Sequence, residues 1–565
     1  MRSPTSDVRR PSSDTSSVPP MKDTAKGKSI AVLAVLSAAM FVYVIDTTLM
    51  NVSISALVED LSTAVGEVQA AITLYTLTMA AFMLTGGKLG DIWGSKRAFR
   101  IGLIIYGIGT TITAFAPNIG FVMIGWSILE GLGSALIVPA INTLVRANYQ
   151  GTKRASAYGV LFGVAAAGAA FGPLIGGWVT TEYSWRYAFA GEAIIVLLVL
   201  LSSGLLVDAP KVVPKPRLDA VGVVLSVAGM GMFVLGVLQT TGRGWTDPLV
   251  LTLMVGGLLV LGVFVWWIRG REIRGEPALF RPSIFRHRGI AIGLPILATQ
   301  LFAQAGLLFL IPLFTQSVLG FDAFQTGLTL LPLSIGVLLT SILTPPLGRR
   351  IYPKYLVQVG LVVMFIGGYI LALSLDGAIE GTDMLLGLLI GGVGIGLIVG
   401  QLPNLILSSV DQDEASEASG LQGTFQNLGM ALGTAVIGTV ILSISLASFN
   451  NQVEASNVLP PESKVELAAL IAEPLEEANA DGLEEFVVHL SPDQQAEIRR
   501  IYDTGTIRGF QGAILVGGFV ALLGAALAVF LPRRKLESDA SVESTIKEVI
   551  RTPAIPSVQL EMEDL

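Results

Sequence analysis

The sequence predicts an all-α polytopic membrane protein, and two observations support this class. The first is composition, because 52% of the 565 residues are hydrophobic and only 14% are charged, whereas soluble domains carry about 25% charged residues. The second is that apolar runs of about 19 residues or more recur along the chain, each long enough to cross about 30 Å of hydrocarbon. Separately, the absence of cysteine excludes disulfides and thiolate chemistry.

Hydropathy over a window of about 19 residues predicts fourteen membrane spans. The polar residues before the first span are rich in Ser and Pro, so we expect a disordered tail there, and the first span is too long for a cleavable signal. The predicted spans, in order, are 30–52, 68–87, 98–116, 120–145, 156–179, 187–206, 220–239, 249–268, 290–314, 324–347, 355–375, 384–406, 419–446 and 510–531.

The basic residues predict how these spans are oriented. If the N-terminus is cytoplasmic, 30 of the 36 lysines and arginines fall on the cytoplasmic side, as the positive-inside rule requires. An even number of spans then places both termini in the cytoplasm. We therefore expect a multi-pass protein of the cell (inner) membrane.

Two parts of the chain resemble each other at a spacing of 261 residues. Gly131 to Val138 aligns with Gly392 to Val399, and four glycines of the following spans also coincide, although chance matching between glycine-rich helices is an alternative. The copies run in the same direction, as in transporters whose halves rock around a central site. The predicted organisation is a disordered cytoplasmic tail (1–29), a six-helix bundle (30–207), an inserted helix pair with a basic cytoplasmic loop (208–289), a second six-helix bundle including an outer acidic loop at 450–508 (290–531), and a cytoplasmic tail (532–565).

Several motifs make the chain resemble the major facilitator superfamily. The loop after the second span is similar to that family's cytoplasmic loop motif, which Gly87, Leu89, Asp91, Gly94, Lys96 and Arg97 match. Ile92 and Ser95 stand where the family usually has Arg. Asp46 to Val52 resembles the Asp-x-Thr-x-x-Asn-Val pattern of the fourteen-span drug:proton antiporter branch, and Trp185-Arg186-Tyr187 fits the same branch.

The fifth span resembles the motif associated with the family's antiporters, through Gly168, Gly172, Pro173, Gly176 and Gly177. Pro173 frees a carbonyl and bends the helix, while the glycines let another backbone approach closely. The resemblance implies a gating seal that hinders proton leak, and ordinary packing of small residues is the alternative. It also implies the major facilitator fold with 14 transmembrane helices (6 + 2 + 6). The transport that it implies is driven by the proton gradient and needs no cofactor.

Three acidic residues fall within predicted spans, namely Asp46, Glu130 and Glu192. A charge at a helix centre costs about 2.5 to 3.5 kcal/mol on insertion scales, so such acids usually face a wet cavity and have a function. Because no basic residue lies in the interior of a span, we expect Asp46 and Glu130 to exchange protons during transport. A structural hydrogen bond is the alternative role for each. We expect Glu192 near the outer surface, where it could reach Arg186 or water, either as a proton carrier or as an interfacial acid without a role.

Amide side chains supply the candidates for a substrate cavity, and interhelical hydrogen bonding is an equally good explanation for them. With Asn51, the candidates are Gln300, Gln304, Gln401, Asn404, Gln422 and Gln426. A cavity with acids and amides but no cation favours cationic or neutral substrates over anions.

The sequence therefore predicts proton-coupled export (antiport) of lipophilic cationic or neutral amphiphiles such as drugs. The alternatives are export of an endogenous metabolite or lipid by the same mechanism, and a membrane ligand sensor or scaffold that does not transport. The predicted spans contain no arrangement of a nucleophile with a base and no set of metal ligands, so an enzyme is not expected. The sequence contains no ATP-binding motif. The expected partners are a small-molecule substrate and the lipid bilayer, not nucleic acid, with the monomer as the functional unit.

Two loops carry clusters of acids. The outer loop 450–508 holds twelve acidic residues and is either a solvated cap or a docking site for an accessory protein, with helices that start near Ser463 and Pro492. The inner loop around Glu414 and Glu417 is wholly acidic, and pairing with the basic segment 269–288 would explain it.

Overall fold

The computed structural model describes residues 23–149, 151–208, 217–375, 381–410, 414–461, 463–464, 467 and 490–533. These residues form helices and short connections, and no strand occurs among them. Thirteen described helices are long and apolar enough to cross a membrane. The remaining predicted span is α4 (Ser95–Ala114), which is less apolar because its first turns carry Lys96, Arg97 and Arg100. The prediction of an all-helical membrane protein with about fourteen spans is confirmed.

The first half of the chain contains the helices that correspond to the first six predicted spans. They are α1 (Asp23–Val52), α2 (Ile54–Leu61), α3 (Val65–Trp93), α4, α5 (Ile119–Val122), a π-helical segment (Met123–Glu130), α6 (Gly131–Asn148), α7 (Gly151–Glu182) and α8 (Trp185–Ser202), followed by a 3-10 turn (Ser203–Leu205). Because α5, the π-helical segment and α6 are continuous, they form one span from Ile119 to Asn148.

The rest of the described chain holds the inserted pair and the second half. The elements are α9 (Ala220–Arg243), α10 (Pro248–Ile273), a 3-10 turn (Pro282–Arg286), α11 (Arg288–Ser317), α12 (Ala323–Arg350), α13 (Pro353–Ser374), a 3-10 turn (Gly381–Met384), α14 (Leu385–Val399), α15 (Leu402–Leu407), α16 (Ala415–Ala455), α19 (Pro492–Leu527) and a final 3-10 turn (Ala528–Phe530).

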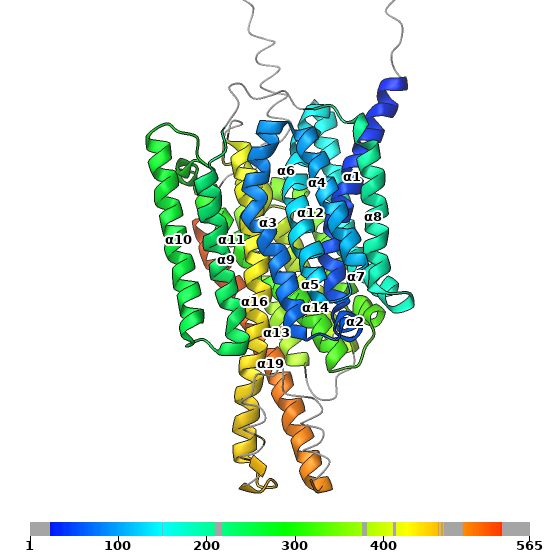
Figure 1. Cartoon of the computed structure of the whole chain (residues 1–565), viewed down its shortest axis with the longest axis vertical. Coiled ribbons are helices and arrows are strands. Elements are labelled where there is room, and N and C mark those ends of the chain that lie inside the picture. Colours follow the sequence, from blue (N-terminus) through cyan, green and yellow to red (C-terminus); the bar gives the residue numbers. More distant parts are fainter. Residues whose placement is uncertain are drawn as a thin grey trace, which may run out of the picture.

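The two halves pack their helices in matching pairs. In the first half, α1 lies against α7, α6 lies against both α3 and α4, and α4 lies against α8. In the second half, α11 lies against α16, α14 lies against both α12 and α13, and α13 lies against α19. The halves meet where α3 packs on α16 and α7 packs on α12 (Figure 1). Each spanning helix of the first half thus has a counterpart eight spans later, as the sequence repeat at a spacing of 261 residues predicts.

The inserted helices α9 and α10 form a hairpin at one side of the molecule, and α9 contacts α3 and α16 (Figure 1). Asp219 stabilises the start of α9, since its buried carboxylate accepts hydrogen bonds from the Gly222 N–H at 3.0 Å and from Trp267 Nε1 at 3.0 Å. Trp267 belongs to α10, so this carboxylate also joins the two helices of the hairpin.

Several helices extend beyond the predicted boundaries, and α1, α16 and α19 do so by the most residues at a single end. Helix α1 begins at Asp23, within the segment predicted as a disordered tail. Helices α16 and α19 extend beyond the rest of the helical body (Figure 1), so that α16 continues to Ala455 and α19 already begins at Pro492. The start near Pro492 is confirmed, and Ser491 and Gln494 form a capping box there. The described ends of the outer loop are thus helical, while residues 468–489, and the tails 1–22 and 534–565, lie outside the described residues.

Candidate proton and substrate site

The three acids predicted within the spans meet inside the first half. Asp46 of α1, Glu130 of the π-helical segment and Glu192 of α8 each place a carboxylate oxygen so that all three atoms lie within 4.8 Å of one another. Their exposed fractions are 0%, 0% and 4%. We call these residues the acid cluster.

The structure differs from the expectation that Glu192 could reach Arg186 or water. Glu192 is buried, and Arg186 instead forms an ion pair with Asp60, with 2.6 Å between Nη1 and Oδ2. The same Asp60 oxygen accepts a hydrogen bond from Trp185 Nε1 at 2.9 Å. Arg186 is therefore occupied at the helix end, and Glu192 belongs to the cluster instead.

Each acid accepts one hydrogen bond from a neighbouring side chain. Trp126 Nε1 donates to Asp46 Oδ1 at 2.7 Å, and the Tyr106 hydroxyl donates to Glu192 Oε2 at 3.4 Å. The Thr113 hydroxyl donates to Glu130 Oε1 at 3.3 Å. The second oxygen of each carboxyl group is buried and has no hydrogen-bond partner among the described residues. Each acid thus keeps one oxygen on which a proton can reside.

The acid cluster also lacks a basic partner among the described residues, since no Lys, Arg or His forms an ion pair with any of the three acids. Charges buried in a membrane protein are normally paired or protonated. Bound protons, or a cationic ligand, are therefore the available means of neutralising this cluster.

A π-helical segment places Glu130 in the cluster. Such segments are rare and often lie at functional sites, and this one ends at Glu130 itself. Close packing against α4 supports it, because a Cβ at Gly109 would lie 2.5 Å from the Gly125 carbonyl oxygen and 2.8 Å from Glu130 Cγ. The absence of a side chain at Gly109 therefore lets α4 and the π-helical segment approach closely enough to bury the acid.

Aromatic residues hold the hydrogen-bond donor of Asp46 in place. The rings of Tyr75 and Trp126 stack with centroids 4.7 Å apart and an interplanar angle of 10°, and both side chains are 1% exposed. Tyr75, Tyr106 and Trp126 are not among the residues predicted from the sequence. The only available signal was that Trp126 lies one helical turn before Glu130, which is too weak to single it out.

The antiporter-like motif of α7 lies at two helix contacts. Gly172 and Gly176 face α1, where a Cβ at Gly176 would lie 2.9 Å from Leu49 Cγ. Pro173 and Gly177 face α12 of the other half, and a Cβ at Gly327 of α12 would lie 2.5 Å from the Pro173 carbonyl oxygen. The motif therefore forms part of the tight contact between the two halves.

The amide candidates do not share one environment. Asn51 donates to the Thr47 carbonyl of its own helix at 3.0 Å, and Gln401 donates to the Thr344 carbonyl of α12 at 2.9 Å. Gln300 is buried and donates to Gln304 at 2.5 Å. Asn404 is exposed, whereas Gln422 and Gln426 are half-buried. Asn51 and Gln401 thus bind backbone, which leaves Gln300, Gln304, Gln422 and Gln426 as candidates for substrate contact.

The cytoplasmic loop motif forms a charged network between helices. Gly94 has a φ of 96°, which favours glycine, and the following Lys96 N–H donates to Asp208 Oδ1 at 2.9 Å. Lys88 of α3 pairs with Glu417 of α16 at 3.5 Å, across the contact between the halves. Glu417 also pairs with Arg281 at 3.2 Å.

His287 lies 3.0 Å from Glu414. The predicted pairing between the acidic inner loop and segment 269–288 is therefore confirmed for Glu414 and Glu417; residues 411–413 lie outside the described part of the chain.

Comparisons with known proteins agree with this architecture. Residues 36–434 match the family described as Major Facilitator Superfamily. The chain is 31% identical to the cephamycin export protein CmcT of Amycolatopsis lactamdurans, over 74% of this chain and 86% of that protein. It is 30% identical to the puromycin resistance protein pur8 of Streptomyces alboniger, over 72% and 81%.

The tetracenomycin C resistance and export protein of Streptomyces glaucescens is 26% identical over 91% of this chain and 93% of that protein. Among solved structures, a peptide transporter POT in complex with sulfate aligns with a TM-score of 0.56 and 17% identity, covering 89% of this chain and 96% of that one; this likeness concerns the fold alone. The chain belongs to the Major Facilitator Superfamily, and it is a transporter rather than an enzyme.

Proposed function

We propose that the chain exports lipophilic cationic or neutral amphiphiles in exchange for protons, and that Asp46, Glu130 and Glu192 bind those protons. The observation that carries the proposal is the acid cluster, with three buried carboxyl groups within 4.8 Å and no basic partner among the described residues. Two unit charges at this separation repel each other by about 3 kcal/mol at an effective dielectric constant of about 20. The cluster therefore requires protons or a cationic substrate to compensate its charge.

This requirement supplies the coupling. A cation that reaches the cluster makes the ionised carboxyl groups favourable and so releases protons, while protons arriving from the other side neutralise the acids and release the cation. The two halves meet along α3 with α16 and α7 with α12, so a change at these contacts would alternate access to the cluster. The glycines and Pro173 of α7 are the proposed seal.

The relatives support export as the direction of transport. Their names include resistance to puromycin and export of cephamycin and tetracenomycin C. A second candidate function is dedicated export of one endogenous product, because several of these names refer to a single compound, as does that of the probable actinorhodin transporter of Streptomyces coelicolor.

We also propose that the protein lies in the cell (inner) membrane with both termini in the cytoplasm. We propose further that it functions as a monomer and that the proton gradient drives its transport. The distribution of 30 of 36 basic residues to one side supports this orientation. The helical ends of the outer loop, on α16 and α19, are the proposed place for an accessory protein.

Transport by the purified full-length chain in liposomes tests the proposal. A pH gradient is imposed, and the uphill movement of ethidium, puromycin and tetracenomycin C is followed in the wild type and in Asp46→Asn, Glu130→Gln and Glu192→Gln. Each variant should lose at least about tenfold in gradient-driven transport. Glu59→Gln, which removes an exposed acid of α2, is the matched control.

Uphill pumping at the wild-type rate after neutralisation of both Asp46 and Glu130 would refute the role of the acids. Movement of only one compound of a wide panel would favour the dedicated exporter. Binding without any flux would show a sensor or scaffold.

A further inference from the structure

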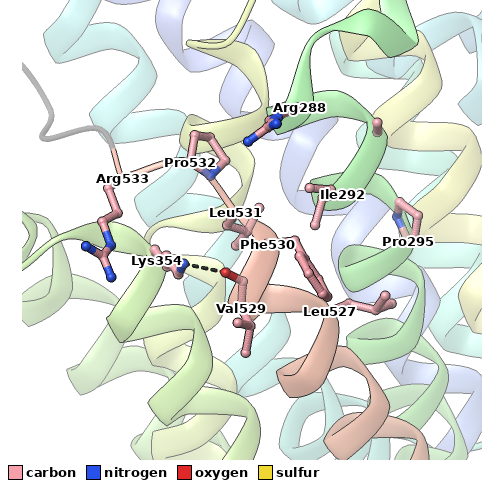
Figure 2. A pocket seen from close by; sticks show the side chains of 11 residues that line it. Arg288, Ile292, Pro295, Lys354, Leu527, Val529, Phe530, Leu531, Pro532 and Arg533 are labelled. Carbon is pink, nitrogen blue, oxygen red and sulfur yellow. Dashed lines mark hydrogen bonds between the residues drawn. The ribbon is translucent and has the colours of Figure 1, made fainter.

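A cavity separate from the acid cluster lies where the starts of α11 and α13 meet the end of α19. Its volume is about 630 Å³, and Figure 2 shows the side chains that line it. Three of them are cationic, namely Arg288, Lys354 and Arg533, and most of the others are apolar; the described part of the chain contributes no acidic residue to the lining. This composition indicates a ligand with one anionic and one apolar part.

Among the described residues, no carboxylate compensates the cations of this cavity. Arg288, Lys354 and Arg533 form no ion pair with a carboxylate in the described part of the chain. Lys354 is 8% exposed, and its Nζ donates one hydrogen bond to the Val529 carbonyl (Figure 2), so it retains two further donors. Because α11 begins at Arg288 and α13 at Pro353, the positive ends of two helix dipoles also point toward this region.

The apolar part of the cavity continues along the outside of α19. Phe519, Leu523, Leu527 and Phe530 are 58%, 62%, 39% and 66% exposed, and their spacing of three or four residues places them along one side of the helix. In a membrane-spanning helix, such a stripe faces lipid chains. Leu527 and Phe530 belong both to the stripe and to the cavity lining, so an acyl chain that follows the stripe would bring its head group to the three cations.

We propose that this cavity binds the head group of an anionic phospholipid, with the phosphate at Arg288, Lys354 and Arg533 and an acyl chain along α19. A phosphate between these residues would join the first turns of α11 and α13 to the segment that follows α19. The bound lipid would therefore stabilise the second half at the end where α19 leaves the bilayer. This binding requires no transport, so it can be tested independently of the proposed function.

The test measures lipid binding to the purified full-length protein in detergent, by native mass spectrometry and by the rise in melting temperature. Phosphatidylglycerol is compared with phosphatidylcholine. We expect Arg288→Gln/Arg533→Gln to lower the affinity for phosphatidylglycerol by about 30-fold, the effect of two cations near a charged lipid surface. The matched control is Arg269→Gln/Arg286→Gln, which removes two exposed arginines outside the cavity and should leave the affinity unchanged.

Two further measurements separate the lipid from a free anion and from a folding defect. Phe530→Ser keeps every cation, and it should weaken phosphatidylglycerol binding but not the binding of glycerol phosphate. Unfolding in phosphatidylcholine should be the same for all variants, which verifies that they fold.

Equal affinity of the wild type for both lipids, or an equal loss in the control double variant, would overturn the proposal. Displacement of phosphatidylglycerol by millimolar inorganic phosphate would show a site for free phosphate and would also overturn it.

Discussion

Replacing Gly177 by alanine should open the contact between α7 and α12. A Cβ at Gly177 would lie 2.8 Å from the carbonyl carbon of Ala323 and 3.0 Å from Phe324 Cα, so it would collide with backbone that cannot rotate away. The helices must separate locally, and overpacking of this kind costs about 1 to 3 kcal/mol. That cost would shift the balance between closed and open arrangements of this end by about 5- to 150-fold. The adjacent hydrogen bond, from the Phe324 N–H to the Thr181 hydroxyl at 3.1 Å, should weaken with it.

Electron paramagnetic resonance can measure this opening without a background signal, because the chain contains no cysteine. Spin labels on cysteines that replace Tyr183 and Val318 report the separation of the halves. Both residues are exposed, Tyr183 directly follows α7, and Val318 directly follows α11. Gly163→Ala is the matched control, because it lies in α7 and its Cβ would have nothing within 4 Å. Gly177→Ala should add a population at longer distance, and Gly163→Ala should not. Identical distance distributions in both variants would refute the reasoning.

Three further substitutions test other contacts. Trp126→Phe removes the donor to Asp46 but keeps a ring against Tyr75; the free energy of unfolding should fall by about 1 to 3 kcal/mol, whereas Trp245→Phe, at an exposed site, should change nothing in the same melt. Gln69→Leu removes hydrogen bonds to the carbonyls of Thr434 and Ala435, at 2.9 and 3.2 Å across the α3–α16 contact. The free energy of unfolding should fall by about 1 to 2 kcal/mol. Unchanged unfolding would show that these hydrogen bonds do not stabilise the fold. Glu417→Gln removes pairs with Lys88 and Arg281 and should cost less than about 1 kcal/mol, an effect that disappears in high salt; a loss independent of salt would contradict an electrostatic origin.

Hydropathy predicted the spans because a chain in hydrocarbon must satisfy its backbone hydrogen bonds within each helix. It did not predict where those helices end. Hydropathy marks the thickness of the hydrocarbon, whereas α16 continues to Ala455 and α19 starts at Pro492. Beyond the rest of the helical body these ends pack on each other, because Phe449 and Val453 share a cluster with Ile498 and Ile501.

The acids of the candidate site could be recognised from the sequence, but their arrangement could not. An acid in an apolar run is costly, which singled out Asp46 and Glu130. The surroundings of Glu192 were inferred from its distance to the nearest loop, and that distance does not indicate its burial or its hydrogen bond with Tyr106. The meeting of all three acids depends on how α1, the π-helical segment and α8 are brought together, and no spacing within one helix encodes such contacts.

The wide turn that ends at Glu130 has a consequence for how this acid could move. In a π-helical segment the backbone hydrogen bonds join residues i and i+5. If the segment changed to the α-helical pattern, in which they join i and i+4, the register would shift by one residue and the Glu130 side chain would rotate by about 100° around the helix axis. Glu130 would then turn away from Asp46 and Glu192 while the neighbouring helices stayed in place. A local change of winding could thus disconnect one carboxyl group from the other two before any rigid-body motion begins.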